Sequence, residues 1–297
     1  YGMELNAFKN RLSVYLEGFY ERRSNILING SSSVSNIIGI GVSKLNAGIQ
    51  DYKGFDASVS WDDKIGKDFN YSIGANASYV NSKIINDGQE YQQYDYLYTK
   101  GNRVGQRYGL EAIGFFHDQV EINNSPVQTF STVRPGDIKY KDQDGNHVLD
   151  TKDLIYVKNS SNPDFNFSLR LGASYKGFFV NVMFQGATGY QQNIKELYTT
   201  NSGSLQRFQK YHLTDTWTPD NPGASLPRIK FATANDNNRK ESTFWVRDCD
   251  FLRLKSLSLG YALQPAVLKK LKLTSASIAL QGSNLVTWSS LLSLIHI

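Results

Sequence analysis

Apolar and polar residues alternate along several long stretches of this chain. Between residues 165 and 175, every second side chain is apolar and the residues between them are polar or small. The apolar set is Phe165, Phe167, Leu169, Leu171, Ala173 and Tyr175, and the intervening set is Asn166, Ser168, Arg170, Gly172 and Ser174. Side chains of a strand point alternately to opposite faces. The pattern therefore predicts a β-strand with one apolar face and one wetted face.

The same period of two returns along the whole chain. The predicted strands cover residues 8–20, 55–61, 69–79, 163–175, 178–186, 244–261 and 273–286. Short turns at Lys64–Lys67 and at Lys176-Gly177 join neighbouring strands into hairpins. The last two strands are separated by a turn around Pro265 and Lys269-Lys270.

Two long polar segments interrupt the strands. Residues 86–132 are expected to form a loop with one or two short strands. Residues 190–242 are rich in turn formers, and only residues 204–213 have a helical pattern. Loops of this length without a core of their own are usually functional or disordered.

Strand length separates the two architectures that such alternation allows. Strands in globular sandwiches average about five or six residues, whereas a tilted crossing of the outer membrane needs about 9–11. Several predicted strands reach ten residues, and short connections alternate with long ones. The sequence therefore favours an all-β, antiparallel transmembrane β-barrel with long extracellular loops. A secreted β-sandwich that binds carbohydrate by aromatic stacking is the alternative.

Composition narrows the function classes. Of the 297 residues, 13% are aromatic, which suits either the girdles of a barrel or the core of a sandwich. The net charge of +5 is spread along the chain without a basic block, so no nucleic-acid partner is expected. The chain has no run of about 18 consecutive apolar residues, so no transmembrane helix is predicted. Cys249 is the only cysteine and excludes an intrachain disulfide.

An acidic turn carries the best metal-ligand pattern in the chain. Its carboxylate and amide side chains occupy the first, third, fifth, ninth and twelfth positions of a calcium loop: Asp142, Asp144, Asn146, Asp150 and Asp153. His147 stands where such loops have glycine, and the loop closes if His147 adopts a positive φ. Either a Ca²⁺ site or a plain turn held by side-chain-to-backbone hydrogen bonds fits this pattern. No other cofactor is expected.

A tyrosine cluster is the candidate ligand-binding surface. Tyr91, Tyr94, Tyr96 and Tyr98 could stack on sugar rings or peptides, or could simply pack within a loop. None of the motifs for a serine hydrolase, a nucleotide-binding loop or a zinc protease is present. A glycoside hydrolase would need two carboxyl groups about 5–10 Å apart in a cleft, and the sequence places no such pair. We therefore expect no enzymatic activity.

Four sequence segments, which occur in a fixed order along the chain, together carry a specific resemblance to a known family. They are YGMELNAFKNRLSVYLEGFYERRSNIL, RPGDIKYKDQDGNHVLDTKD, NPDFNFSLRLGASYKGFFVNVMFQGATG and FLRLKSLSLGYALQPAVLKKLKLTSASIALQGSNLVTWS. With them the chain resembles the C-terminal part of SusC/RagA-type TonB-dependent outer-membrane transporters. Residues 1–289 would then be a partial, open section of a barrel of about 22 strands. Residues 290–297 are expected to be a truncated or non-native tail.

The resemblance also implies partners and a location. The family imports glycans or peptides across the outer membrane of Gram-negative bacteria. Its N-terminal plug, expected outside these residues, contacts TonB, and a SusD-like surface lipoprotein covers the extracellular mouth. Outer-membrane lipid would surround the barrel wall. The residues that match the family's acidic loop are Asp142, Asp144, Asn146, Asp150 and Asp153, with His147 in place of the usual glycine.

Overall fold

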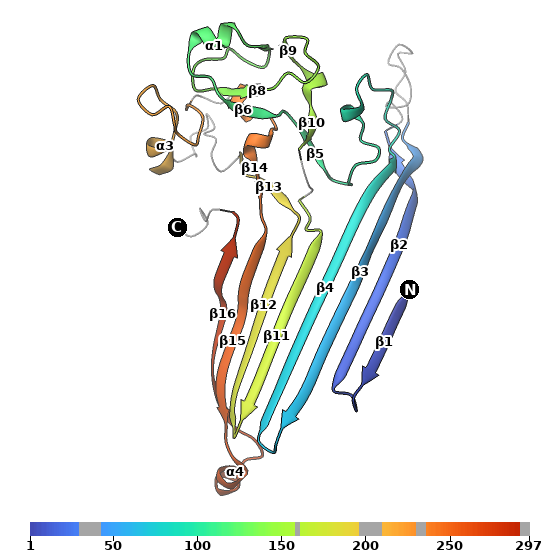
Figure 1. Ribbon diagram of the computed structural model, residues 1–297, viewed down its shortest axis with the longest axis vertical. Helices are drawn as coiled ribbons and strands as arrows, with labels where there is room; N and C mark the ends of the chain where they lie inside the picture. Colours follow the sequence, from blue (N-terminus) through green and yellow to red (C-terminus); the bar gives the residue numbers. More distant parts are fainter. Residues whose placement is uncertain (30–42, 158–160, 196–209, 230–235, 292–297) are drawn as a thin grey trace.

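One antiparallel sheet of eight long strands dominates the structure (Figure 1). The computed structural model describes residues 1–29, 43–157, 161–195, 210–229 and 236–291. In sheet order the strands are β1 (Gly2–Ala7), β2 (Leu12–Ile28), β3 (Leu45–Ile65), β4 (Phe69–Asn86), β11 (Phe165–Tyr175), β12 (Phe178–Thr188), β15 (Phe251–Ala262) and β16 (Ser277–Ser289). Each strand pairs with the next long strand along the chain, so the sheet is a meander.

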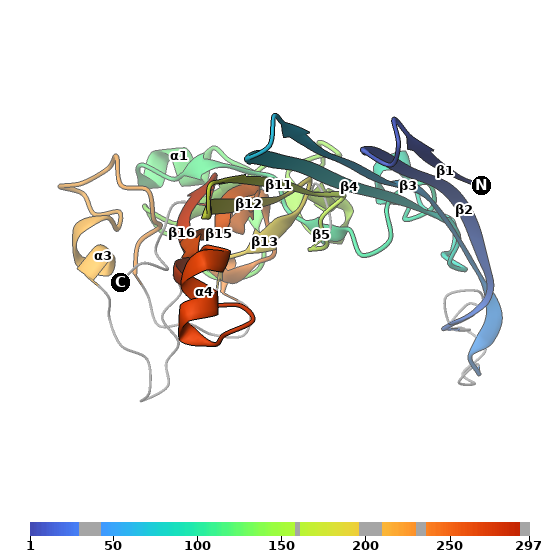
Figure 2. The ribbon, with the colours of Figure 1, turned by 90° about the horizontal axis from the view of Figure 1, so that it is seen from below.

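The sheet is curved and open. Seen from below, the strands follow an arc with β1 and β2 at one end and β15 and β16 at the other (Figure 2). β1 and β16 are edge strands of this sheet and do not pair with each other. The predicted all-β architecture, an open section of a barrel wall, is confirmed. Among the described residues, no helix combines the length and the apolar character needed to cross a membrane.

Strand register lines up the apolar residues on one face across the entire sheet. One row of directly paired residues is Leu5, Val14, Val59, Ala75, Leu169, Phe184, Leu254 and Val286. The row beside it, on the other face, is Glu4, Tyr15, Ser58, Asn76, Ser168, Gln185, Arg253 and Thr287. A slip of one residue on any strand would exchange the two faces, so the pattern fixes the register.

The two faces differ in what their side chains contact. On the polar face, Ser58 donates to Oδ1 of Asn76 at 2.8 Å, and the Asn76 amide donates to Oγ of Ser168 at 3.1 Å. On the apolar face, Leu5 and Val59 are 46% and 40% exposed. A continuous apolar surface over eight strands is unusual for a soluble monomer and is typical of the outer face of an outer-membrane barrel.

Aromatic residues lie at both ends of the apolar face. Near the short turns are Trp61, Phe69, Tyr71, Tyr175, Phe178 and Tyr261, and toward the other end are Tyr20, Phe55, Tyr79, Phe165 and Phe167. Phe69 and Tyr79 are ten positions apart, or about 34 Å along the strand. A tilt of about 40° reduces this to about 26 Å, which matches the apolar band of about 25 Å in outer-membrane barrels.

The first hairpin corrects one strand prediction. Residues 8–20 do not form a single strand, because Phe8, Lys9 and Asn10 all have positive φ and turn the chain between β1 and β2. Phe8 fitted the predicted strand because it is an even number of positions before Leu12, the first residue of β2, although it belongs to the turn. The predicted turns before β4 and between β11 and β12 are confirmed, with Gly66 and Gly177 at positive φ.

The C-terminal strands also differ from the prediction. A helix, α4 (Pro265–Leu271), replaces the predicted turn, and β16 starts four residues later than expected. Pro265 occupies the start of α4, where its missing N–H costs nothing. The predicted strand 244–261 is divided into a 3₁₀ turn (Thr243–Trp245), β14 (Val246–Asp248) and β15. Residues 292–297 of the predicted tail lie outside the described residues.

The long connections fold together beyond one end of the sheet (Figure 1). We call this unit the cap: residues 87–157, 190–195, 210–229 and 236–250. Its strands are β5 (Arg107–Gly109), β6 (Ala112–Phe115), β7 (Val127–Gln128), β8 (Ile138–Tyr140), β9 (Val148–Leu149), β10 (Ile155–Val157), β13 (Gln191–Asn193) and β14. Its helices are α1 (Gln119–Asn123), α3 (Lys210–Thr214) and 3₁₀ turns at Asp95–Leu97, Thr151–Asp153, Asn237–Arg239 and Thr243–Trp245.

The cap has a hydrophobic core, contrary to the expectation of loops without one. The buried cluster is Leu110, Ile138, Tyr140, Leu149, Leu226 and Trp245. Asp137 is fully buried beside it and pairs with Arg228, with 2.8 Å between Nε and Oδ1. Of the helix predicted at 204–213, the structure describes only residues from 210 on, where α3 begins. The long loops therefore present a folded surface at one rim of the sheet.

Candidate functional site

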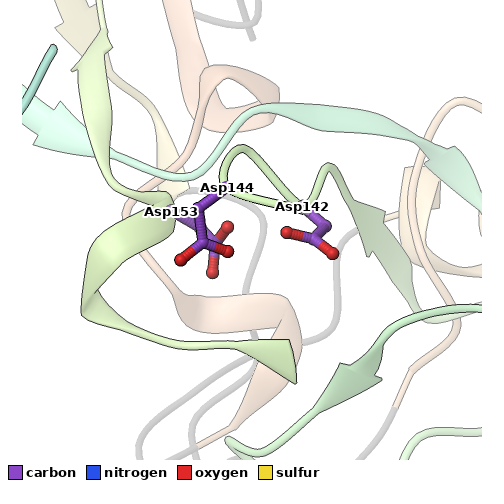
Figure 3. A group of neighbouring side chains, drawn as sticks. All are labelled: Asp142, Asp144 and Asp153. Carbon is purple, nitrogen blue, oxygen red and sulfur yellow. The ribbon is translucent and has the colours of Figure 1, made fainter. Parts of the chain in front are cut away.

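The acidic turn lies in the cap and runs from Asp142, just after β8, to Asp153 at the end of the 3₁₀ turn Thr151–Asp153; its three aspartates are shown in Figure 3. Backbone N–H groups hold its first carboxylate: Gly145 and His147 each donate to Asp142 at 2.7 Å. His147 has φ of 65°, the left-handed conformation that the sequence required for closure. The turn thus closes without glycine at its sixth position.

Asp153 anchors the other end of the turn. It is fully buried, and its two oxygens accept from the backbone N–H groups of Gln143 and Asp150 at 2.7 and 2.8 Å. Asp150 accepts from the backbone N–H of Lys152 at 2.6 Å, and it also accepts from the backbone of Asp153, which completes a capping box on the 3₁₀ turn. This local network explains why the segment folds the way it does.

Three of the five predicted ligands converge. Carboxylate oxygens of Asp142, Asp144 and Asp153 lie within 4.8 Å of one another. Ca²⁺ bonds oxygen at about 2.3–2.6 Å, so two ligands of one ion are at most about 5 Å apart and the spacing fits. Asn146 and Asp150 lie outside this group, and each uses a side-chain oxygen to accept from a backbone N–H of the turn.

The carboxylates experience opposite electrostatic effects. Burial raises the pKa of Asp153, and the nearby charges of Asp142 and Asp144 raise it further. For Asp142, partial burial acts upward, but backbone N–H donors, His147 first, outweigh it and lower the pKa. A buried carboxyl group that faces two others is destabilised as an anion, and a bound cation would relieve this.

Two of the candidate tyrosines adjoin the acidic turn. The rings of Tyr94 and Tyr96 stack at 5.3 Å, and the Tyr94 hydroxyl donates to Asp144 at 3.4 Å. The Tyr96 hydroxyl donates to the carbonyl of Lys152 at 2.8 Å. Partial burial and then the charge of Asp144 raise the pKa of Tyr96 to about 12, so this phenol remains a donor at neutral pH.

The other two tyrosines are placed differently. Tyr91 is 86% exposed, whereas the hydroxyl of Tyr98 accepts from the backbone N–H of Gln92 and braces the loop. Sequence reasoning treated the tyrosines and the acidic turn as separate candidates. It also missed Asp137 and Arg228, which are 91 residues apart and give no local signal.

Fold and site together define a class of protein. Strands long enough to cross an outer membrane, one continuous apolar face and a folded cap at one rim are the features of an outer-membrane β-barrel wall. No family model matches the sequence. Curated proteins match it in sequence, and solved structures match its fold.

The curated relatives are TonB-dependent receptors. Two from Formosa agariphila are 26% and 24% identical to this chain over 97% of its length, which is 29% of theirs. Among solved structures, the RagAB peptide transporter matches with a TM-score of 0.68 at 23% identity, over 97% of this chain and 31% of that one. The RagAB peptide importer in the open-open state matches equally well, with a TM-score of 0.68.

These likenesses confirm the resemblance to SusC/RagA-type transporters. The homologues of the chain are TonB-dependent receptors, and its fold is that of part of the RagA barrel. The chain spans about 29% of the length of the curated relatives it matches. They are named as receptors and not as enzymes, in agreement with the expectation of no catalytic activity.

Proposed function

We propose that residues 1–289 form the C-terminal part of the barrel wall of a TonB-dependent transporter in the outer membrane of a Gram-negative bacterium. The observation that carries this proposal is the apolar row from Leu5 to Val286, one residue on each of the eight strands. A polar row runs beside it on the opposite face. Such a wall separates lipid from a hydrated lumen, which is what a transporter needs and a soluble binding module does not.

The transported substrate is proposed to be a glycan or a peptide. RagAB, whose fold this chain shares, is a peptide transporter. Energy for uptake would come through TonB, which a plug domain outside these residues would contact. Within this chain, stacked Tyr94 and Tyr96 are the proposed contact for sugar rings or peptide side chains, because stacked aromatic faces suit both.

A SusD-like lipoprotein is the proposed partner of the cap. The cap is a folded surface, and it exposes large apolar side chains that its own core does not use. Val120 on α1 is 67% exposed, and Ile113 and Val127 are 51% and 61% exposed. Apolar residues of this kind on a rigid rim are suited to a protein contact.

We also propose that the acidic turn binds one Ca²⁺ ion. Asp142, Asp144 and Asp153 would hold it directly, and Asn146 and Asp150 would support the turn through the backbone. The ion would fix the turn beneath Tyr94 and Tyr96, so its contribution is structural. The fit rests on the spacing of the three carboxylates and on the closed backbone at His147.

The fold gives no support to the alternative of a carbohydrate-binding sandwich. A sandwich buries its apolar face against a second sheet. In the described part of the chain, the small two-stranded sheets lie beyond the rim of the large sheet and not on its faces (Figure 1).

Uptake by the intact transporter tests the proposed function. Cells that carry it should accumulate labelled glycan or peptide, and accumulation should stop when TonB is deleted or the proton gradient is collapsed. Binding to the cell surface should survive both treatments. Accumulation that continues without TonB, or a protein recovered only in soluble fractions, would contradict the proposal.

A further inference from the structure

Basic residues occupy the apolar face where β2, β3 and β4 approach the cap. Three successive rows of directly paired residues lead toward that rim: Gly18, Phe55 and Tyr79; then Tyr20, Lys53 and Asn81; then Arg22, Asp51 and Lys83. All nine share the face that carries Val59 and Ala75, because each row is two residues beyond the last. The face therefore changes from aromatic to cationic within two rows.

The charges in these rows are unequally compensated. Arg22 donates two hydrogen bonds of 2.7 Å to Asp51, one to each carboxylate oxygen, so this carboxylate is already paired. Lys53 and Lys83 are exposed, and neither forms an ion pair within the described residues. The ammonium groups of Lys53 on β3 and Lys83 on β4 thus project from one face. The carboxylate of Asp51, directly opposite Lys83, is already paired with Arg22.

A cavity of about 440 Å³ lies at these lysines. Its charged lining consists of Lys53, Lys83, Arg103 and Asp51, and the Asp51 carboxylate is the one already paired with Arg22. The wall opposite β3 is built by residues 101–106, which continue the sheet past the end of β11. Gly101 donates to the carbonyl of Ile84, and Ile84 donates to that of Asn102, both at 2.8 Å.

Arg103 is held in place within this wall. Its guanidinium makes two hydrogen bonds to Asp164, which itself is tied to β4 through the backbone of Val80. The cavity is therefore formed by β3, β4 and a fixed loop, and its cations are presented on a rigid frame. A rigid frame lowers the entropy lost when a ligand binds.

Depth in the membrane identifies the ligand chemistry. Lys53 follows the aromatic row by two residues, or about 7 Å along the strand. Aromatic girdles mark the boundary between hydrocarbon and headgroups, so the lysines lie at the level of headgroup phosphates. The long-loop rim of an outer-membrane barrel faces the outer leaflet.

We infer that this cavity binds the phosphate of an anionic glycolipid in the outer leaflet. The inference rests on the proposed function, because that function sets which rim faces outward. Lys53 and Lys83 would contact the phosphate as point charges, and the side-chain amide of Gln106, whose oxygen accepts from the backbone N–H of Arg103, offers its N–H donors to the attached sugar. Tyr20, Phe55 and Tyr79 would pack against the upper part of the acyl chains.

Lipid binding by the purified intact transporter tests this inference. Diphosphoryl lipid A is titrated into detergent micelles that contain the wild type or the double variant Lys53→Gln/Lys83→Gln. Each cation near an anionic membrane surface contributes a factor of about five, so the double variant should bind roughly twenty-five-fold more weakly. Lys64→Gln/Lys67→Gln at the opposite rim is the matched control and should bind as the wild type does.

Three comparisons make the result decisive. Dephosphorylated lipid A should bind as weakly to the wild type as the phosphorylated form binds to the double variant. Lys53→Arg/Lys83→Arg should retain binding, which separates charge from packing. Equal binding by both double-glutamine variants, or displacement of lipid A by millimolar inorganic phosphate, would overturn the inference.

A failure here is distinguishable from failure of the proposed function. Folding of each variant into the barrel is checked independently, by the altered mobility of unheated samples in gels that contain dodecyl sulfate. If the variants fold and take up substrate through TonB but bind lipid A like the wild type, only the lipid site is wrong.

Discussion

At the scale of single residues, a charge placed on the apolar face of β4 should cost more free energy than one placed on its polar face. Ala75 lies on the apolar face between Val59 and Leu169, near the middle of the strand's apolar stretch. An arginine there would sit in hydrocarbon, at a cost of about 2–4 kcal/mol. We expect Ala75→Arg to lower the stability of the intact barrel in lipid vesicles by this amount, measured by urea-dependent folding.

The neighbouring residue provides the control. Asn76 points to the polar face, where it bonds Ser58 and Ser168. Asn76→Arg loses these hydrogen bonds but keeps its charge hydrated, so it should cost about 1 kcal/mol or less. Equal losses at both positions would show that the faces are wrongly assigned.

A glycine of the cap gives a second prediction at this scale. Gly136 has φ of 86°, and a Cβ added there would lie 2.2 Å from a ring carbon of Trp217. Gly145 has φ of 74° but open space around it. Gly145→Ala should cost about 1–2 kcal/mol for backbone strain alone, and Gly136→Ala about 1–3 kcal/mol more for overpacking. Protease resistance of the cap in each variant measures the difference, and equal resistance would contradict it.

At the scale of elements, the acidic turn should make the cap sensitive to pH and to calcium. The folded cap raises the pKa of Asp153 above the usual aspartate value, near 4, so the folded state retains this proton to a higher pH than the unfolded state. Stability from this group is therefore present at low pH and lost as pH rises through its folded pKa. The lowered pKa of Asp142 acts in the opposite direction, but only below about pH 4.

Hydrogen exchange of cap amides tests this balance in the intact protein. Without calcium, protection around the turn should fall as the pH is raised from about 4 to 7, and about 1 mM Ca²⁺ should restore it at pH 7 only. Asp153→Asn should abolish both dependences, whereas Asp220→Asn, an exposed cap residue, should preserve them. If Ca²⁺ does not change hydrogen-exchange protection at neutral pH, the acidic turn binds no calcium and is held by its hydrogen bonds alone.

The long strands could largely be predicted from the sequence, because their two faces lie in different surroundings and the residues alternate accordingly. β11 alternates along its whole length and β4 alternates from Phe69 to Tyr79, as expected for strands with one proposed lipid face and one proposed lumen face. The error at Phe8 arose where an apolar turn residue continued the period. The closed backbone of the acidic turn was predictable because its carboxylates and His147 are close in sequence.

The cap could not be predicted in the same way. Its strands are two to four residues long, too short to show a period. Its core joins Leu110 to Leu226 and Trp245, which are more than a hundred residues away in the chain. The contact between Tyr94 and Asp144 crosses 50 residues, and nothing local marks it.

At the scale of the whole molecule, the proposed function requires one property of the sheet: one face contacts lipid and the other contacts water. Single cysteines introduced at each position from 69 to 79 of β4 report this property directly. Cys249 is buried in the cap and would first be changed to serine. A fluorophore on each cysteine is then exposed to a lipid-soluble and to a water-soluble quencher in the intact transporter in vesicles.

A membrane-spanning wall predicts quenching with a period of two residues. Labels at odd positions, including 73, 75 and 77, should respond to the lipid-soluble quencher, and labels at even positions should respond to the water-soluble one. Similar responses at odd and even positions, or water access along the whole of β4, would contradict the proposal that this sheet is a membrane-spanning wall.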